Sequence, residues 1–204
     1  MDMVLDHLIV SAADLTAGTA SVASALGQPL QPGGQHALFG THNQLLSLGA
    51  EDYLEVIAVD PGAAPLERAR WYDLDRFGGP TRLTNWALRV SDLDAALAAL
   101  GPGFGAPIAV SRGDLRWRMA VPATGVLPYD NCAPALLEWE TPPPGPRLTE
   151  RGCRLVELTV CHPAAEALSA LLAPHFTDAR VRFAAGMPRL IARVATPAGE
   201  RVLA

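Results

Sequence analysis

The order of apolar and polar segments repeats along this chain, and the repeat restricts the possible fold more than any other feature. Residues 1–62 contain a β-rich strand, an Ala-rich helical segment and three further strand-like runs. Residues 83–141 show the same order, and residues 153–204 show a shorter version of it. Residues 63–82 form a connector, and the Pro-rich residues 142–152 predict a stiff, extended linker. The sequence therefore predicts two βαβββ units followed by a C-terminal βαβββ-like unit.

Helix caps place the first two units in one frame. Asp14 and Asp92 each precede an Ala-rich apolar segment, and an aspartate in that position accepts hydrogen bonds from the free N–H groups of a helix start. His7 lies seven residues before the first cap, and Asn85 lies seven residues before the second. We infer that these two polar residues occupy equivalent positions in the first strand of each unit.

Strand alternation indicates which polar side chains face inward. Glu55 lies in an otherwise apolar fourth strand, and the fourth strand of the second unit aligns with it so that Glu138 is its counterpart. We therefore expect His7, Glu55, Asn85 and Glu138 to point to one interior. A buried carboxylate has to be paired with a cation, bound to a metal or protonated, so an ion pair with an arginine is the alternative for Glu55. For Glu138 an exposed rim position is the alternative.

Composition excludes several classes of function. The chain has 204 residues, is 50% hydrophobic and carries a net charge of −5, which predicts a packed core and gives no basic surface for nucleic acid. No apolar run approaches the ~20 residues that span a bilayer, and no signal peptide is visible, so the cytoplasm is the expected compartment. The sequence contains no lysine, which excludes Schiff-base and P-loop chemistry. Three cysteines without a CxxC pair are interpreted as buried thiols.

The first connector carries three aromatic residues. Residues 67–77 contain Trp71, Tyr72 and Phe77 and predict a short helix that ends at the following Gly-Gly-Pro. We interpret the aromatic side chains as packing over a barrel edge. A lid over a pocket is the sharper alternative.

In this frame the chain resembles the vicinal oxygen chelate superfamily, which includes glyoxalase I, extradiol dioxygenases and bleomycin-resistance proteins. A βαβββ unit with a histidine in its first strand and a glutamate in its fourth is typical of that superfamily. The resemblance to its glyoxalase-like domain group is closer, and it is carried by Gly34-Gln35-His36, Gly40-Thr41-His42-Asn43 and Tyr53-Leu54-Glu55. It implies an α+β fold in which paired βαβββ modules form a half-open barrel.

The resemblance also implies a divalent metal ion, such as Zn, Ni, Mn or Fe, held by both modules. Carried over by position, the ligands are His7, Glu55, Asn85 and Glu138. Asparagine offers only an amide oxygen and is a weaker ligand than the histidine or glutamine that the family more often has there. Glu55 and Glu138 are the candidates for moving a proton. For His7 the alternative is a hydrogen-bonded histidine that lines a cavity without metal.

Four further residues are candidates for orienting a substrate. His36, Thr41 and Asn43 lie at the corner between the second and third strands, where stabilisation of the turn is the alternative role. Arg89 shares the face of Asn85, so it is expected to bind an anionic substrate or to pair with a glutamate. Three arginines of the second unit are interpreted as a solvated strand face: Arg112, Arg116 and Arg118.

Two classes of function follow from this sequence. The first is a metal-dependent lyase, isomerase or oxygenase, including a dioxygenase, that acts on a small oxygenated metabolite. The second is a metal-free protein that binds or sequesters a small molecule on the same fold. The histidine with two glutamates favours the first class, and Asn85 favours the second. The resemblance leaves room for a homodimer that completes the barrel, although the third unit of the same chain is an alternative for that role.

Overall fold

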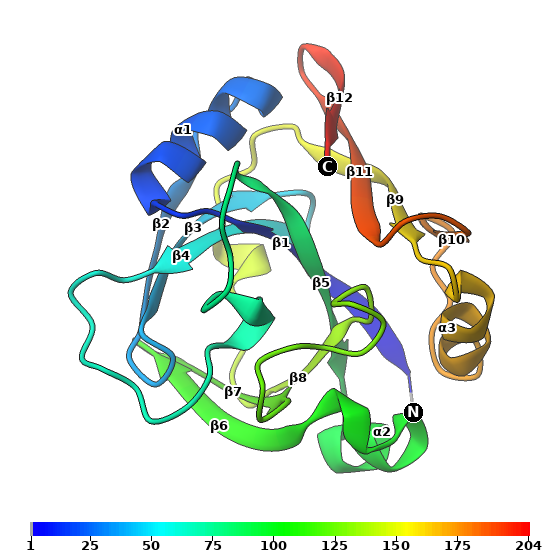
Figure 1. The fold of residues 1–204 in the computed structure, drawn as a ribbon. Helices are drawn as coiled ribbons and strands as arrows, with labels where there is room; N and C mark the ends of the chain where they lie inside the picture. The colour runs from blue at the N-terminus through cyan, green and yellow to red at the C-terminus, as the bar shows by residue number, and fades with distance from the viewer. Residues whose placement is uncertain (1) are drawn as a thin grey trace.

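The computed structural model describes residues 2–204, and its main feature is a curled sheet of eight strands. The first unit contains β1 (Met3–Ser11), α1 (Leu15–Leu26), β2 (Gln31–His36), β3 (Thr41–Ser47) and β4 (Tyr53–Val59). The second contains β5 (Arg82–Val90), α2 (Leu93–Leu100), the short helix η2 (Pro102–Phe104), β6 (Ala106–Arg112), β7 (Leu115–Val121) and β8 (Ala135–Trp139). Figure 1 shows the sheet curling around the segment that links the two units.

The order of strands in this sheet confirms the predicted duplication. It is β2-β3-β4-β1-β5-β8-β7-β6, so the second unit mirrors the first about the antiparallel β1–β5 pair. His7 lies opposite Ala87, and Ile9 lies opposite Asn85. If His7 corresponds to Asn85 and Ile9 corresponds to Ala87, each residue lies opposite the counterpart of the other, as a local two-fold axis between the strands requires. Asn85 is therefore the structural counterpart of His7. The fold is the predicted α+β half-barrel of paired βαβββ modules.

The predicted caps form as expected. The Asp14 carboxylate accepts a hydrogen bond from the N–H of Ala17 at 2.8 Å, and Asp92 accepts one from Ala95 at 2.9 Å. Gly27 ends α1 in the left-handed conformation, which a residue without a Cβ adopts at low cost. The predicted helix over residues 67–77 is wrong, because this stretch forms only a single 3₁₀ turn, η1 (Trp71–Asp73).

A second, smaller sheet follows the short helix η3 (Gly145–Arg147). Its elements are β9 (Arg154–Cys161), α3 (Ala165–Leu172), β10 (Val181–Ala184), β11 (Arg189–Thr196) and β12 (Gly199–Leu203). Element order is that of a βαβββ unit, but the strand order is β10-β9-β11-β12. In the two modules the first strand pairs in parallel with the last strand, whereas β9 pairs in parallel with β10. The third unit therefore repeats the sequence pattern without repeating the pairing.

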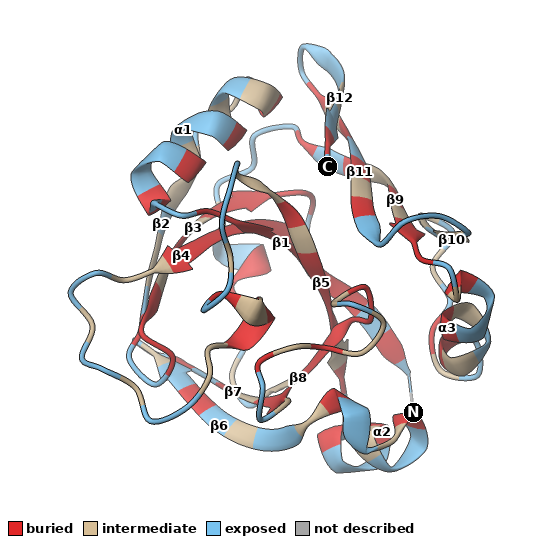
Figure 2. Ribbon diagram, viewed as in Figure 1, coloured by how far each residue is buried: buried red, intermediate tan, exposed pale blue. Residues whose placement is uncertain are grey.

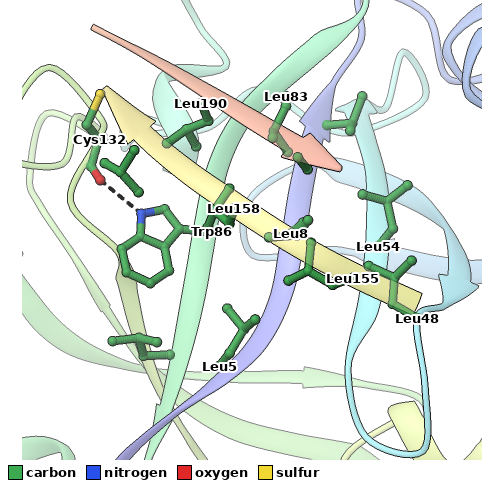
Figure 3. Packing of buried hydrophobic residues seen from close by; sticks show 14 of the residues in the cluster. Leu5, Leu8, Leu48, Leu54, Leu83, Trp86, Cys132, Leu155, Leu158 and Leu190 are labelled. Carbon is green, nitrogen blue, oxygen red and sulfur yellow. Dashed lines mark hydrogen bonds between the residues drawn. The ribbon is translucent and has the colours of Figure 1, made fainter. Parts of the chain in front are cut away.

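The two faces of the large sheet belong to two different apolar clusters. The outer face packs against α1, α2 and the small sheet in one core, as Figure 3 shows for Leu8, Leu54, Trp86, Leu155 and Leu158. A smaller cluster lies inside the half-barrel and holds the aromatic residues of η1, β7 and β8. Figure 2 shows that β1, β4 and β5, at the centre of the sheet, are buried along most of their length. Polar side chains on their inner face are therefore shielded from water.

Candidate functional site

A partly open cavity of about 30 Å³ lies inside the half-barrel. This space is enough for about two water molecules, since one water needs roughly 10–15 Å³ measured in this way. The lining combines polar and aromatic side chains: His7, His36, Tyr53, Glu55, Trp71, Tyr72, Arg112, Trp117, Met119, Leu137 and Trp139. It includes three of the residues predicted for the site, namely His7, Glu55 and His36.

A β-bulge at the start of β1 supplies the partner of His7. The pairing with β5 shifts between Leu5 and His7, which leaves Asp6 as an extra residue in the strand. Such a bulge breaks the alternation and turns two successive side chains toward one side. The Asp6 carboxylate accordingly lies 2.6 Å from Nδ1 of His7, and it accepts a hydrogen bond from Nε1 of Trp139 at 2.9 Å.

His7 lies between two carboxylates. Its other ring nitrogen, Nε2, is 3.5 Å from a carboxylate oxygen of Glu55, and the ring stacks on Tyr53 with centroids 4.6 Å apart. Burial disfavours the charged imidazole, but the hydrogen bonds and negative charges of Asp6 and Glu55 outweigh it and raise the pKa of His7 to about 9. Burial also favours a protonated Glu55, but His7 and Asn43 outweigh it and lower the pKa of Glu55 to about 2. At neutral pH the pair is an imidazolium facing a carboxylate.

Asn43 links Glu55 to Arg112 of the second module. Its amide nitrogen donates to Glu55, while its amide oxygen accepts from Nη1 of Arg112 at 3.0 Å and from the N–H of Gly34 at 2.8 Å. Because every polar atom of this side chain is engaged, the amide is fixed in one orientation.

His36 is neutral in this site. Burial and the positive charges of Arg112 and His7 lower its pKa to about 4, against the opposing charge of Glu55. Its Nδ1 lies 3.0 Å from the hydroxyl of Thr41, and its Nε2 lies 3.3 Å from Nη1 of Arg112. The guanidinium can only donate, so Nε2 accepts and the ring proton is on Nδ1.

The connector between the modules lines one side of the cavity with Trp71 and Tyr72. Trp71 stacks on Phe39 at 4.1 Å and meets the edge of His36 at 5.0 Å. Tyr72 and Asp73, the next residues, have φ values of 58° and 57°, a left-handed conformation that is uncommon for residues with a side chain. The aromatic residues of this segment therefore pack over the barrel, as the first of the two sequence interpretations expects, and the role of the segment as a lid stays a prediction.

Glu138 lies on the opposite face of the sheet, so its predicted inward position is wrong. Ile9 pairs with Glu55, whereas Ala87, the counterpart of Ile9, pairs with Ala135. Glu138 is three residues beyond Ala135, and an odd offset reverses the face of a strand. Its carboxylate binds Arg118 at 3.1 Å, which in turn binds the first turn of α2.

Two other predicted residues stay outside the cavity lining. Arg89 forms an ion pair with Glu51 and lies 3.8 Å from Asp6, so it supports the far side of the His7–Asp6 pair instead of facing a substrate. Asn85 is fully buried, and its amide nitrogen donates to the carbonyl of Asn131 at 3.4 Å. The structure thus brings together His7, Glu55, His36, Thr41 and Asn43, all of which come from the first module.

Sequence reasoning missed several residues of this site. Asp6 was not singled out because alternation assigns it to the other face, and a bulge has no clear sequence signal. Arg112 was assigned to a solvated face, although it is the single arginine of its strand, next to Gly113 at the hairpin turn. Trp139 follows Glu138 directly in the sequence and carries an indole N–H that can donate a hydrogen bond. With the correct register of its strand, Trp139 instead of Glu138 is the residue that faces inward.

The donor set does not fit the predicted metal centre. Of the four expected ligands, only His7 and Glu55 lie next to each other. Both ring nitrogens of His7 face carboxylates, those of Asp6 and Glu55. Catalytic zinc sites have three protein ligands. Within residues 2–204 no group of three or more His, Cys, Asp or Glu side chains is arranged to hold a metal ion. The arrangement instead provides an acid, a base and a cation around one cavity.

A half-barrel of paired βαβββ modules, with a polar site on the inner face of the first module, is the arrangement of the vicinal oxygen chelate fold. The chain belongs to the glyoxalase-like domain family of the vicinal oxygen chelate superfamily, whose model matches residues 5–176. No curated protein matches the sequence.

Solved structures match this chain at low sequence identity. A hypothetical protein from Staphylococcus aureus matches with a TM-score of 0.61 and 18% identity over 84% of this chain and 74% of that chain. Methylmalonyl-CoA epimerase from Mycobacterium tuberculosis matches with a TM-score of 0.41 and 23% identity over 68% of this chain and 88% of that one. A methylmalonyl-CoA epimerase variant from Streptomyces coelicolor matches with a TM-score of 0.45 and 16% identity over 67% of this chain and 97% of that chain. In the part of the chain that the structure describes, no helix is long and apolar enough to cross a membrane.

Proposed function

We propose that this protein is an enzyme of the isomerase or lyase class that moves a proton on a small oxygenated metabolite. The observation that carries the proposal is the buried His7–Glu55 pair, whose facing atoms are 3.5 Å apart at the wall of the cavity. Proton abstraction next to a carbonyl needs a base for the carbon acid and a donor for the developing oxygen charge. A carboxylate and an imidazolium supply both.

Glu55 is the proposed base. Asn43 holds one of its oxygens, and the other faces Nε2 of His7 and the cavity. His7 is the proposed donor to the substrate oxygen. Asp6 keeps the His7 ring charged and oriented, so it acts as a positioning residue.

This chemistry is assigned to side chains of the chain itself and contains no metal step, because only His7 and Glu55 of the four predicted ligands lie next to each other. A carboxylate–imidazolium pair favours isomerase or lyase chemistry over oxygenation, since proton transfer is what it supplies. The second candidate is binding of a small molecule without turnover. Aromatic walls that enclose the cavity, including Trp71, Trp117 and Trp139, favour that candidate.

Exchange of carbon-bound hydrogen with D₂O tests the proposal. A panel of small carbonyl compounds, both charged and neutral, is incubated with the protein, and loss of the C–H signal is followed by proton NMR. We expect Glu55→Gln to lower the exchange rate on an active compound by about 100-fold or more, which is the usual contribution of a general base. Treatment with EDTA is expected to leave the wild-type rate unchanged.

Glu138→Gln is the matched control, because it makes the same change in the carboxylate on the outer face. It should retain the wild-type exchange rate. Equal rates in the wild type and Glu55→Gln would contradict the role of Glu55, and loss of exchange after EDTA would contradict a metal-free step. Binding without exchange in the wild type would favour the second candidate.

A further inference from the structure

We propose that Arg112 is the carboxylate-binding group of the cavity and that the substrate is a small 2-oxo acid. This inference deepens the proposed function and rests on it for the reaction, although the binding site can be tested separately. Four features of the site carry it: the path by which Arg112 reaches the cavity, the neutral partners of its guanidinium, an unpartnered donor nearby, and the link through Asn43 to Glu55.

Arg112 reaches the site across the open seam of the half-barrel. It ends β6, one edge strand of the large sheet, and its contacts are on β2 and β3 at the other edge. Two glycines of β2 leave room for this crossing. A Cβ at Gly34 would lie 2.8 Å from Cδ of Arg112, and a Cβ at Gly33 would lie 2.0 Å from the amide oxygen of Asn43. The local sequence is thus adapted to hold these two side chains in place.

The side-chain hydrogen bonds of the Arg112 guanidinium all go to neutral acceptors. Nη1 donates to the amide oxygen of Asn43 and to Nε2 of the neutral His36. Among residues 2–204 no carboxylate lies within 4.0 Å of this guanidinium, whereas Arg118 and Arg180 each bind two carboxylates. A partly buried arginine with neutral partners has unused capacity for an anion, and its planar N–H groups match a carboxylate in a bidentate contact.

A second donor in the same lining also lacks a partner. The indole N–H of Trp71 is buried and makes no hydrogen bond within the described residues. Buried donors are normally satisfied, so an unpartnered one in a cavity wall indicates a missing acceptor. Of the two cations in the lining, His7 lies between the carboxylates of Asp6 and Glu55, whereas Arg112 has no carboxylate partner, so an anionic ligand would be held by Arg112.

The link through Asn43 sets the distance between the anion and the base. One amide group separates Arg112 from Glu55, so a carboxylate on Arg112 would place the neighbouring carbons of a small acid beside Glu55 and His7. In a 2-oxo acid the ketone acidifies the C3–H bond. That bond breaks, the proton goes to the Glu55 carboxylate, and the electron pair forms an enolate whose oxygen accepts a hydrogen bond from His7. Return of the proton to carbon completes an exchange or isomerisation with no oxidant or reductant.

Binding of 2-oxobutanoate and of its uncharged amide tests the assignment. Dissociation constants are measured by calorimetry for the wild type, for Arg112→Gln and for Arg112→Lys. We expect Arg112→Gln to weaken binding of the acid by roughly 10- to 100-fold, because the variant loses a hydrogen-bonded contact to a charged group. Arg112→Lys should recover part of this loss, because it keeps the charge without the bidentate geometry. The amide should bind weakly and equally to all three proteins.

Arg116→Gln is the matched control, since Arg116 lies in the same hairpin on an exposed position, and it should bind the acid as the wild type does. Unchanged binding of the acid by Arg112→Gln would overturn the assignment, and so would equal binding of acid and amide by the wild type. A wild type that binds none of 2-oxobutanoate, 3-methyl-2-oxobutanoate and 2-oxoglutarate at millimolar concentration would overturn the substrate class. Acid binding that depends on Arg112 without C3–H exchange would support this site while contradicting the proposed reaction.

Discussion

At the scale of single residues, the charge of His7 is set by its neighbours more than by its burial. Asp6 and Glu55 both contact the ring, and their hydrogen bonds and negative charges together outweigh the cost of burying an imidazolium. Because the same contacts keep Glu55 ionised, the pair stabilises the fold only while His7 is protonated and Glu55 is not. This coupling makes the stability of the protein depend on pH.

His7→Gln should remove part of that dependence. The raised pKa of His7, about 9 against 6.5, means that its stabilisation is complete below pH 6.5 and is lost as the pH rises toward 9. Urea unfolding of the wild type is expected to show a loss of up to about 3 kcal/mol between pH 6.5 and 9, on the basis of 1.36 kcal/mol per pKa unit. The variant should lack this loss. His42→Gln, at a histidine outside the cavity lining, should keep it, and identical profiles for the wild type and His7→Gln would contradict the charge assigned to His7.

At the scale of elements, we expect the connector of residues 60–81, which lines the cavity with Trp71 and Tyr72, to act as a lid. Its regular structure is limited to η1, and it is fixed by the stacking of Trp71 on Phe39 and by the hydrogen bond from Asp73 N–H to Gly125 O at 3.0 Å. The cavity has room for about two waters, so a 2-oxo acid needs more space than this arrangement provides, and we expect the segment to move when the acid binds. Tyr72 has a φ of 58°, a left-handed conformation that the surrounding contacts have to maintain.

Hydrogen exchange should detect this opening. We expect the amides of residues 61–81 to exchange at least tenfold faster than those of β4 and β5, because few of them belong to a ladder or a helix. Trp71→Ala should accelerate the exchange of this segment further, and Phe77→Ala, at a half-buried position outside the cavity lining, should do so less. Exchange of residues 61–81 as slow as that of β4 would contradict the role of the segment as a lid.

At the scale of the whole molecule, the C-terminal unit shares one core with the barrel. Leu155 and Leu158 of β9 belong to the same apolar cluster as Leu8 and Trp86 on the outer face of the large sheet (Figure 3). Trp86 also donates to the carbonyl of Cys132 at 2.9 Å. The small sheet therefore covers apolar surface that the half-barrel alone would expose, and the two sheets should unfold together.

Leu158→Ala tests this shared core. Leu158 has no exposed surface, and truncating a buried leucine costs about 2–5 kcal/mol. We expect that loss in urea unfolding, with a single transition that has the same midpoint by tryptophan fluorescence and by circular dichroism. Val202→Ala, at a position that is 59% exposed, should change stability by less than about 0.5 kcal/mol. Two separate transitions would contradict a common core.

The sequence by itself determined the duplicated modules, the helix caps and the polar cluster of the first module. These features depend on local patterns: alternation gave His7 and Glu55, and Asp14 and Asp92 fixed the frame. Short-range rules are sufficient there because strand periodicity and capping act over a few residues.

Only the tertiary structure decided which carboxylate belongs to the site. The register of β8 against β5 decides which residue of the second module is equivalent to Glu55. That residue is Ala135, and Glu138, three residues further along, faces the outer side of the sheet. Asp6 contacts His7 because of a bulge, and Arg112 reaches the cavity because the two edges of the sheet curl together. Register, bulges and sheet curvature arise from packing between segments far apart in the chain, so a repeat in the sequence cannot specify them.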